Sequence, residues 1–131
     1  MVLADSSAWI EYDRGTESAV HVRLRELVAK QAEPLGVTEP VLMEVLAGAR
    51  SDEREEQLRR LLLRHHWLPV DAVVDYDAAA RIYRRCRAHG VTPRGLLDCL
   101  IAAVADRNGA ALLTADGDLR RVAAAIGLRL A

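Results

Sequence analysis

The chain has 131 residues, of which 51% are hydrophobic and 28% are charged, and its formal net charge at pH 7 is −1. This length is enough for one packed core and too short for two, so we expect a single domain over residues 1–131. The near-neutral charge excludes a protein that holds nucleic acid through bulk positive charge alone.

No segment has the pattern of a secretory signal or of a membrane span. The first residues lack a basic start followed by a long apolar core, and no apolar run approaches the roughly 20 residues that a span needs. Cys86 and Cys99 lie in segments of helical pattern without Cys-x-x-Cys spacing, which favours buried free thiols over a disulfide. We therefore expect a cytoplasmic protein with no membrane partner.

Short apolar segments alternate with amphipathic ones along the chain. The predicted strands are residues 2–4, 35–37, 67–70, 110–113 and 128–130. The predicted helices are residues 6–12, 17–31, the stretch after Thr38 that runs through VLMEVLAGA, and then 52–63, 75–89, 94–108 and 118–125. Strands without polar alternation, separated by helices, predict a mostly parallel sheet covered on both faces, which is a three-layer α/β/α domain.

Two acids directly follow predicted strands. Asp5 comes after the first strand, and Asp116 comes just past the strand at residues 110–113. Taken alone, each has an ordinary interpretation, because Asp5 is a good cap for a helix beginning near Ser6 and an ADGD stretch is typical of a turn. Taken together, they lie at the sheet edge where parallel α/β domains bind ligands.

Two further acids interrupt apolar helices. Glu44 lies beside the buried arc of VLMEVLAGA, and Asp98 lies at the margin of the apolar arc in RGLLDCLIAAVADRNG. An acid in such a position is partly removed from water. The alternatives are that Glu44 reaches water at the rim of its helix and that Asp98 forms a buried ion pair with Arg94.

All four acids are expected on one edge of the sheet. Clustered carboxylates repel one another and are costly to desolvate, so they need a cation. The candidate ligands are all oxygen atoms, which favours Mg²⁺ or Mn²⁺ over Zn²⁺. Carboxylate-bound Mg²⁺ ordinarily acts on phosphate esters. No histidine ligand set is expected, and we predict surface or strand-flanking positions for His21, His65, His66 and His89.

Three motifs in this order carry a resemblance to a known family. They are ADSSAWIEY near the start, EPVLMEVLAGAR in the middle and LLDCLIAAVADRNGAALLTADGDL towards the end. With them the chain resembles the PIN-domain ribonucleases, and among these the VapC-type toxins of bacterial type II toxin–antitoxin pairs. The resemblance spans essentially the whole chain, and the order and spacing of the motifs are more specific than any one of them.

The resemblance implies a PIN-like sheet of four to five strands and a site of three or four acids that holds one or two Mg²⁺ or Mn²⁺ ions. The implied activity is hydrolysis of RNA phosphodiester bonds by a metal-activated water, as in an endoribonuclease. One departure is Leu119, which stands where family members often carry Phe. The ligands that the resemblance implies in this sequence are Asp5, Glu44, Asp98 and Asp116.

The resemblance also implies supporting residues around these ligands. A hydroxyl follows the first Asp in the family, and here Ser7 is the better candidate and Ser6 the other. Thr114 is expected to orient the loop that presents the fourth acid. The fourth acid is either Asp116 or Asp118 of the ADGD stretch.

The implied partners are RNA, a cognate antitoxin and a second copy of the chain in a homodimer. The antitoxin is expected in a groove near Trp9, Ile10 and the helix that carries Glu44, although Trp9 also suits the core. Because an acidic pocket repels RNA, nearby arginines are needed, and Arg94 and Arg14 are the candidates.

Two other classes of function stay open from the sequence. In a phosphotransfer or phosphatase domain, Asp5 would be a covalent nucleophile. Such domains usually carry a second Asp two residues on, or a lysine at a later strand end, whereas here the residue is Ser7 and the only lysine, Lys30, lies in a predicted helix. The other class is a non-catalytic interaction module of the same fold.

Overall fold

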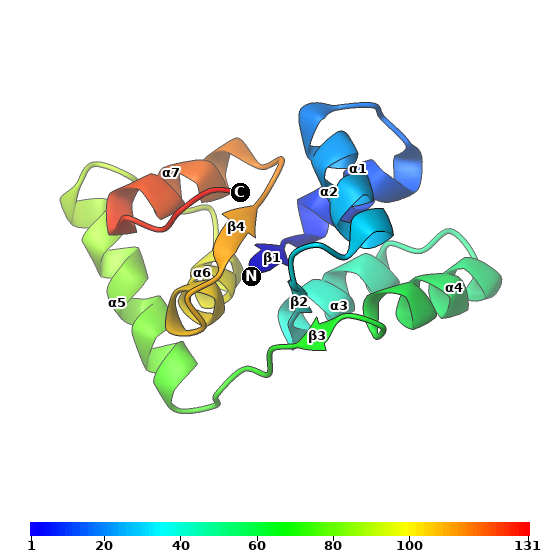
Figure 1. The fold of residues 1–131 in the computed structure, drawn as a ribbon. Helices are drawn as coiled ribbons and strands as arrows, with labels where there is room; N and C mark the ends of the chain where they lie inside the picture. Colours follow the sequence, from blue (N-terminus) through cyan, green and yellow to red (C-terminus); the bar gives the residue numbers. More distant parts are fainter.

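The computed structural model describes all 131 residues, in which four strands alternate with seven helices. The strands are β1 (Val2–Ala4), β2 (Leu35–Val37), β3 (His66–Trp67) and β4 (Ala111–Leu113). The helices are α1 (Ser6–Arg14), α2 (Ala19–Lys30), α3 (Glu39–Ala47), α4 (Asp52–Leu62), α5 (Val74–Ala88), α6 (Leu96–Arg107) and α7 (Gly117–Ile126). In Figure 1, α1 lies with α2, α3 lies with α4, and α5, α6 and α7 gather beside β4.

The sheet is parallel throughout, as predicted, and its strand order is β3-β2-β1-β4. The chain moves outward from β1 through β2 to β3 and then returns to the other side of β1 with β4. The strand order therefore reverses between β1 and β4. In a parallel α/β sheet, the crevice at the carboxyl ends of two such strands is the usual place for a ligand. The three-layer α/β/α class is confirmed.

The third strand is shorter than predicted and sits earlier in the chain. It covers His66–Trp67 instead of residues 67–70, and both of its side chains are exposed. The ladder ends where the amide of Leu68 donates to the carbonyl of Val37 at 2.8 Å, because Pro69 has no amide hydrogen to continue it. The amide of Val70 donates to a side chain instead of to a strand.

The predicted strand at residues 128–130 is reduced to a single bridge. Leu130 pairs with Leu112 in parallel orientation, and two backbone hydrogen bonds of 2.8 and 2.9 Å tie this segment to β4. The sheet therefore has four strands, the lower end of the expected range of four to five.

Two helices begin later than the sequence predicts, because of the residues that precede them. The second helix begins two residues late because the hydroxyl of Ser18 caps it by accepting from the amide of His21 at 3.1 Å. The sixth helix begins at Leu96, since Gly95 before it is extended. Thr38 is the N-cap residue of α3, but its side chain makes no capping hydrogen bond.

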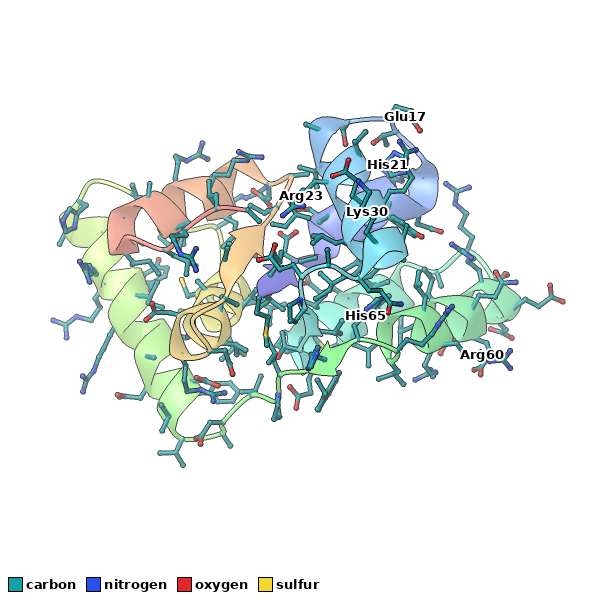
Figure 2. All side chains as sticks on the ribbon, viewed as in Figure 1. Glu17, His21, Arg23, Lys30, Arg60 and His65 are labelled. Carbon is teal, nitrogen blue, oxygen red and sulfur yellow. The ribbon has the colours of Figure 1, made fainter.

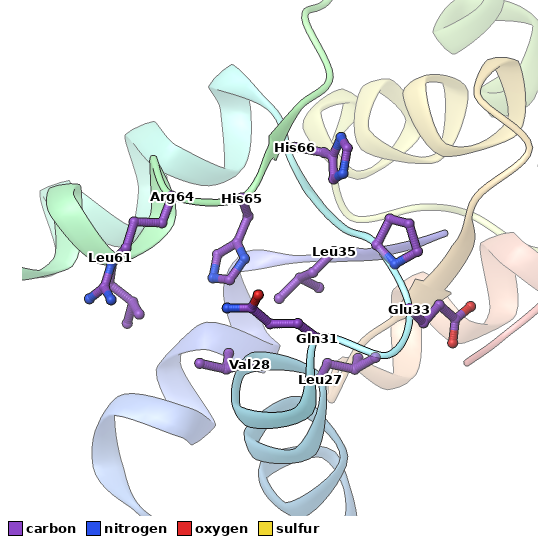
Figure 3. Close-up of a pocket in the computed structure, with 10 residues that line it drawn as sticks. Leu27, Val28, Gln31, Glu33, Leu35, Leu61, Arg64, His65 and His66 are labelled. Carbon is purple, nitrogen blue, oxygen red and sulfur yellow. The ribbon is translucent and has the colours of Figure 1, made fainter.

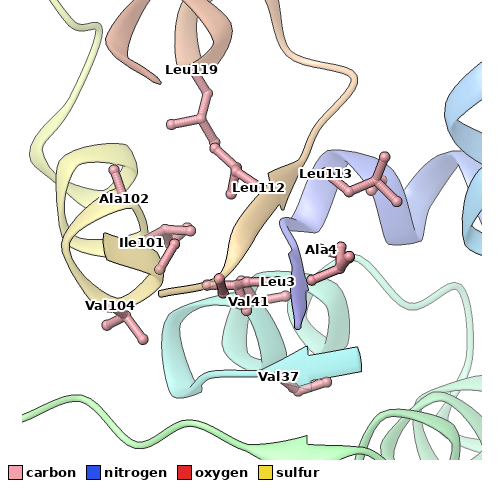
Figure 4. Close-up of a cluster of buried hydrophobic side chains, with 14 of the residues drawn as sticks. Leu3, Ala4, Val37, Val41, Ile101, Ala102, Val104, Leu112, Leu113 and Leu119 are labelled. Atoms are coloured by element: carbon pink, nitrogen blue, oxygen red, sulfur yellow. The ribbon is translucent and has the colours of Figure 1, made fainter. Parts of the chain in front are cut away.

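Aliphatic side chains fill the core, as the absence of phenylalanine requires. In Figure 4, Leu3 of β1 and Leu112 of β4 pack with Ile101 of α6 and Val41 of α3. Trp9 is also fully buried in this cluster. The two cysteines are buried and free, as predicted. None of the seven helices combines the length and the apolar character needed to cross a membrane.

Candidate carboxylate site

The site begins where β1 and β4 end side by side. The amide of Asp5, just after β1, donates to the carbonyl of Leu113 at 3.0 Å. Thr114 and Asp116 follow β4 directly. The parallel pairing of these two strands therefore brings residues more than a hundred positions apart in the sequence to one point at the switch of strand order.

Asp5 is both a helix cap and a buried acid. Its Oδ1 accepts from the amide of Ala8 at 3.0 Å and from the hydroxyl of Ser7 at 2.7 Å, while Oδ2 accepts from the hydroxyl of Thr114 at 2.7 Å. Only 3% of the residue is exposed, and this burial raises the pKa of its carboxyl even though the three hydrogen bonds lower it. The capping role and the site role are thus compatible.

Two hydroxyls link the two strand ends. Ser7 and Thr114 lie 3.2 Å apart, oxygen to oxygen. The Ser7 oxygen also accepts from the amide of Ala115 at 2.9 Å, and the Thr114 oxygen accepts from the amide of Asp116 at 3.0 Å. The structure therefore places Ser7 and Thr114 where they orient Asp5 and the loop that leads to Asp116.

Glu44 reaches the same edge of the molecule from α3. The hydroxyl of Ser6, at the start of α1, donates to its Oε1 at 2.9 Å. Ser6 and Ser7, which the sequence left as alternatives, thus each contact an acid: Ser6 contacts Glu44 and Ser7 contacts Asp5.

Asp98 lies in the first turn of α6 and has the most perturbed carboxyl of the site. Its pKa is raised to about 6. Burial is the main cause, and the negative charges of Asp116, Asp5, Glu44 and Asp118 add to it. Each of these four carboxylates therefore lies close enough to Asp98 to disfavour its charged form. The alternative ion pair of Asp98 with Arg94 does not form, because the Arg94 side chain pairs with Asp116 and Asp118.

The two acids of the ADGD stretch have different environments. Asp116 caps α7: its Oδ1 accepts from the amides of Asp118 and Leu119, and its Oδ2 contacts the guanidinium of Arg94. Asp118 is 6% exposed and accepts from the amide of Arg94 at 2.9 Å and from Arg121 at 3.3 Å. The amide of Arg94 is the main reason that the pKa of Asp118 is lowered. Asp118 thus anchors a loop through the backbone of Arg94, whereas Asp116 caps α7 and contacts only the side chain of Arg94.

The chemistry of this cluster suits a hard divalent cation. Its donors are carboxylate and hydroxyl oxygens, and the pKa of Asp98 is raised by burial and then by the neighbouring negative charges. No three acids lie together closely enough to share one ion in this arrangement. Each carboxylate except that of Asp98 is instead held by a neighbouring hydroxyl, amide or arginine.

Several predicted residues lie elsewhere. Arg14 ends α1 and lines a cleft of about 400 Å³ with Asp13, Arg50 and Arg54. Trp9 belongs to the core, although it also lines a pocket of about 110 Å³ together with Ile10, which is 38% exposed.

The expectation of surface or strand-flanking histidines is wrong for His21. This side chain is buried, and its Nδ1 accepts from the amide of Glu17 at 2.9 Å (Figure 2). His65 lies at a distance from the acids, in a pocket of about 240 Å³ that it lines with Gln31 and Leu35 (Figure 3). This pocket is formed by residues before β2 and β3, so it opens at the opposite edge of the sheet.

Sequence reasoning missed how Arg120 and Arg121 take part. Arg120 donates to the carbonyl of Thr114 at 3.0 Å, and Arg121 pairs with Asp118. Both come from α7 and brace the loop after β4. Their spacing from the ADGD stretch, within one helical turn, is the signal that points to this role.

Comparisons with known proteins agree with this geometry. A PIN domain family model matches residues 2–125. Ribonuclease VapC11 of Mycobacterium tuberculosis and a VapC ribonuclease of Mycobacterium bovis are each 42% identical to the chain, over 100% of it and 98% of the relative.

Solved structures share the fold at lower identity. VapBC2 from Rickettsia felis, bound to a promoter DNA fragment, has a TM-score of 0.76 at 17% identity, with 100% of this chain and 98% of the other covered. VapC20 of Mycobacterium tuberculosis, described as a toxin that cleaves the sarcin–ricin loop, has a TM-score of 0.68 at 18% identity, with 98% and 96% covered.

Proposed function

The chain belongs to the PIN-domain family and, within it, to the VapC-type ribonucleases, and from this premise we propose that it cuts RNA at the carboxylate site between β1 and β4 with the help of Mg²⁺ or Mn²⁺. Its function is that of the toxin in a type II toxin–antitoxin pair, an endoribonuclease that hydrolyses phosphodiester bonds. The observation that supports the site assignment is the meeting of the ends of β1 and β4, where Thr114 donates to the buried Asp5 and the helix after β1 contacts Glu44 through Ser6.

The residues that would hold the ion are Asp5, Glu44, Asp98 and Asp116. A divalent ion bound there supplies a Lewis acid that activates water and stabilises charge on the leaving oxygen. The protein's own part is orientation. Ser7 and Thr114 fix both oxygens of Asp5, and Ser6 fixes Glu44, so these carboxylates are held in place before any substrate arrives.

Histidine chemistry offers no competing mechanism at this edge. His65 and His66 lie at the opposite edge of the sheet, and the hydroxyl of Ser7 donates to Asp5 instead of to an imidazole. A Ser–His or Cys–His pair of the kind used in nucleophilic catalysis is therefore not assembled at the site.

The partners follow from the same family membership. We propose that the antitoxin binds the pocket that Ile10 and Gly48 line between α1 and α3, which opens beside the site helices. For the second copy in a homodimer, we propose the face around Met43 and Tyr76, which are 57% and 58% exposed and line an apolar groove of about 370 Å³. Because its proposed substrate is cellular RNA, we propose that the protein acts in the cytoplasm.

The test is cleavage of purified cellular RNA with Mg²⁺ or Mn²⁺. We expect fragments that disappear with EDTA and in the Asp5→Asn and Asp98→Asn variants. Equal loss of RNA in the wild type and in both variants would refute the assignment of the site. Expression without the antitoxin is expected to stop growth, and co-expression of the antitoxin is expected to restore it.

A further inference from the structure

Arg94 is the one cation that the structure places directly on Asp116. Its guanidinium contacts Asp116 Oδ2 and lies 3.7 Å from Asp118 Oδ2. Asp116 has no other free oxygen, because its Oδ1 is taken by the first amides of α7. An ion that is to use Asp116 therefore competes with Arg94 for the same oxygen atom.

The Arg94 side chain can leave without disturbing the loop that carries it. The loop is held by its backbone, since the amide of Arg94 donates to the buried carboxylate of Asp118 at 2.9 Å. The side chain itself is 70% exposed. Arg94 thus has a fixed pivot at the rim of the site and a guanidinium that is free to move.

We propose that Arg94 is a resident counter-cation that exchanges between Asp116 and a backbone phosphate of the RNA. When no divalent ion is bound, its guanidinium neutralises the carboxylate of Asp116. When the ion takes Asp116, the freed guanidinium holds a phosphate next to the bond that is cut. This inference rests on the proposed function, because it assumes the ion site and the RNA substrate.

The chemistry of the two partners favours such an exchange. A guanidinium presents a planar fork of donors that fits two oxygens of a carboxylate or of a phosphate equally well. A carboxylate cluster repels RNA, and a cation at its rim that is released from Asp116 is able to attract a phosphate in its place. Asp118 keeps the backbone of Arg94 in place in both states.

The first experiment measures Mn²⁺ binding without RNA, from the electron paramagnetic resonance signal of the free ion. Arg94→Ala is expected to bind Mn²⁺ about two- to fivefold more tightly than the wild type, because an exposed ion pair that competes with the ion is removed. The matched control is Arg121→Ala, which removes an ion pair with Asp118 and leaves Asp116 untouched. Unchanged or weaker binding in Arg94→Ala, or an equal gain in the control, would overturn the proposal.

The second experiment measures RNA binding with the four site acids intact, at saturating Ca²⁺ in place of Mn²⁺ so that the RNA is bound without being cut, by fluorescence anisotropy of a labelled single-stranded RNA. Adding Arg94→Ala is expected to weaken binding and to reduce the slope of log K against log salt by about 0.7, which corresponds to one lost phosphate contact. The control is Arg81→Ala on α5, which is 80% exposed and paired with Asp77. An unchanged slope in the Arg94 variant would show that the side chain does not move to RNA and would overturn the exchange.

Failure of the proposed function gives a different result. A wild type that neither binds Mn²⁺ nor cuts RNA refutes the site itself. A wild type that does both, with an Arg94→Ala variant that behaves identically, refutes only the role of Arg94. Arg94→Lys is expected to keep the competition with Mn²⁺ but to recover only part of the RNA binding, because an ammonium lacks the fork.

Discussion

The two ends of the carboxylate site are held by different chemistry. At the β1 end, Asp5 and Glu44 accept hydrogen bonds from the hydroxyls of Ser7, Thr114 and Ser6. At the α7 end, Asp116 and Asp118 are held by arginines and by backbone amides. Asp98 lies between the two ends and has neither kind of partner in the structure.

This difference separates carboxylates that are fixed from carboxylates that are neutralised. A hydroxyl orients a carboxylate and leaves its full charge in place, whereas an arginine cancels that charge. The β1 end is therefore ready to attract a cation, and the α7 end must first release one. The predictions below probe this division.

The largest expected effect is at the hydroxyl-held end. Asp5→Asn removes the charge of a buried carboxylate and places an amide where the hydroxyls of Ser7 and Thr114 donate. The rate of RNA cleavage is therefore expected to fall by more than about 100-fold, which exceeds the loss typical of a residue that only supports a metal ligand. The measurement is the initial rate with a labelled RNA at saturating Mn²⁺. Asp106→Asn, at an exposed position on α6, is the control and is expected to keep the wild-type rate.

A smaller loss is expected when only the orientation of Asp5 is disturbed. Thr114→Val keeps the shape of the side chain but leaves Asp5 Oδ2 and the amide of Asp116 without their partner, which should cost about 10- to 100-fold in cleavage rate or Mn²⁺ affinity. Thr16→Val, at an exposed position after α1, is the matched control. Wild-type cleavage and ion binding in Thr114→Val would mean that the hydroxyls do not prepare this end of the site.

For Asp118, at the arginine-held end, loss of stability is expected instead of loss of cleavage. Asp118→Asn removes a buried charge that accepts from the amide of Arg94 and from Arg121, so we expect the free energy of unfolding to fall by about 1–3 kcal/mol. Cleavage by the folded variant should stay within about tenfold of the wild type. Asp77→Asn on α5 is the control for urea unfolding. A loss of cleavage as large as that in Asp5→Asn would instead make Asp118 a ligand.

The smallest effect is a pH dependence that belongs to Asp98. Its pKa is about 6 in the folded protein, against an ordinary value of 3.8 for an aspartate. The folded state therefore binds more protons between these values, and stability falls as the pH rises from about 4 to about 6. Because Asp98 is only partly buried, the expected difference is about 1 kcal/mol. Urea unfolding of the wild type and of Asp98→Asn in EDTA, at pH 4 to 7, measures it. Parallel pH profiles would show that Asp98 is not perturbed.

Much of the fold was predictable because parallel strands and helix caps leave local signals. The apolar triplet before Asp5 predicts β1, and the glycine that follows the C-cap residue Asn108 predicts the end of α6, both without tertiary information. The third strand was not predictable to the residue. Its length depends on which amides find a partner on β2, and that depends on Pro69 and on a side chain of α3 more than 30 positions away.

The sequence predicts which residues form the site, and that membership stays a prediction, whereas the contacts between these residues could not be predicted. Acids at strand ends and at the margins of apolar helices are visible in a sequence, because periodicity places them. The partner of Arg94 was not visible: helical spacing suggested Asp98, four residues on, but Arg94 precedes the helix and its loop lies against α7. Such a contact is decided by the packing of α6 against α7, which only the structure shows.

The hydrogen bond between Thr114 and Asp5 also determines when the edge of the sheet at the site is completed during synthesis of the chain. It joins residues 109 positions apart, and β4 enters the sheet beside the first strand that is synthesised. A chain still emerging from the ribosome therefore carries Asp5 and Glu44 without the strand that completes their edge. The edge of the sheet that carries the proposed site is therefore complete only after β4 has been translated and has paired with β1.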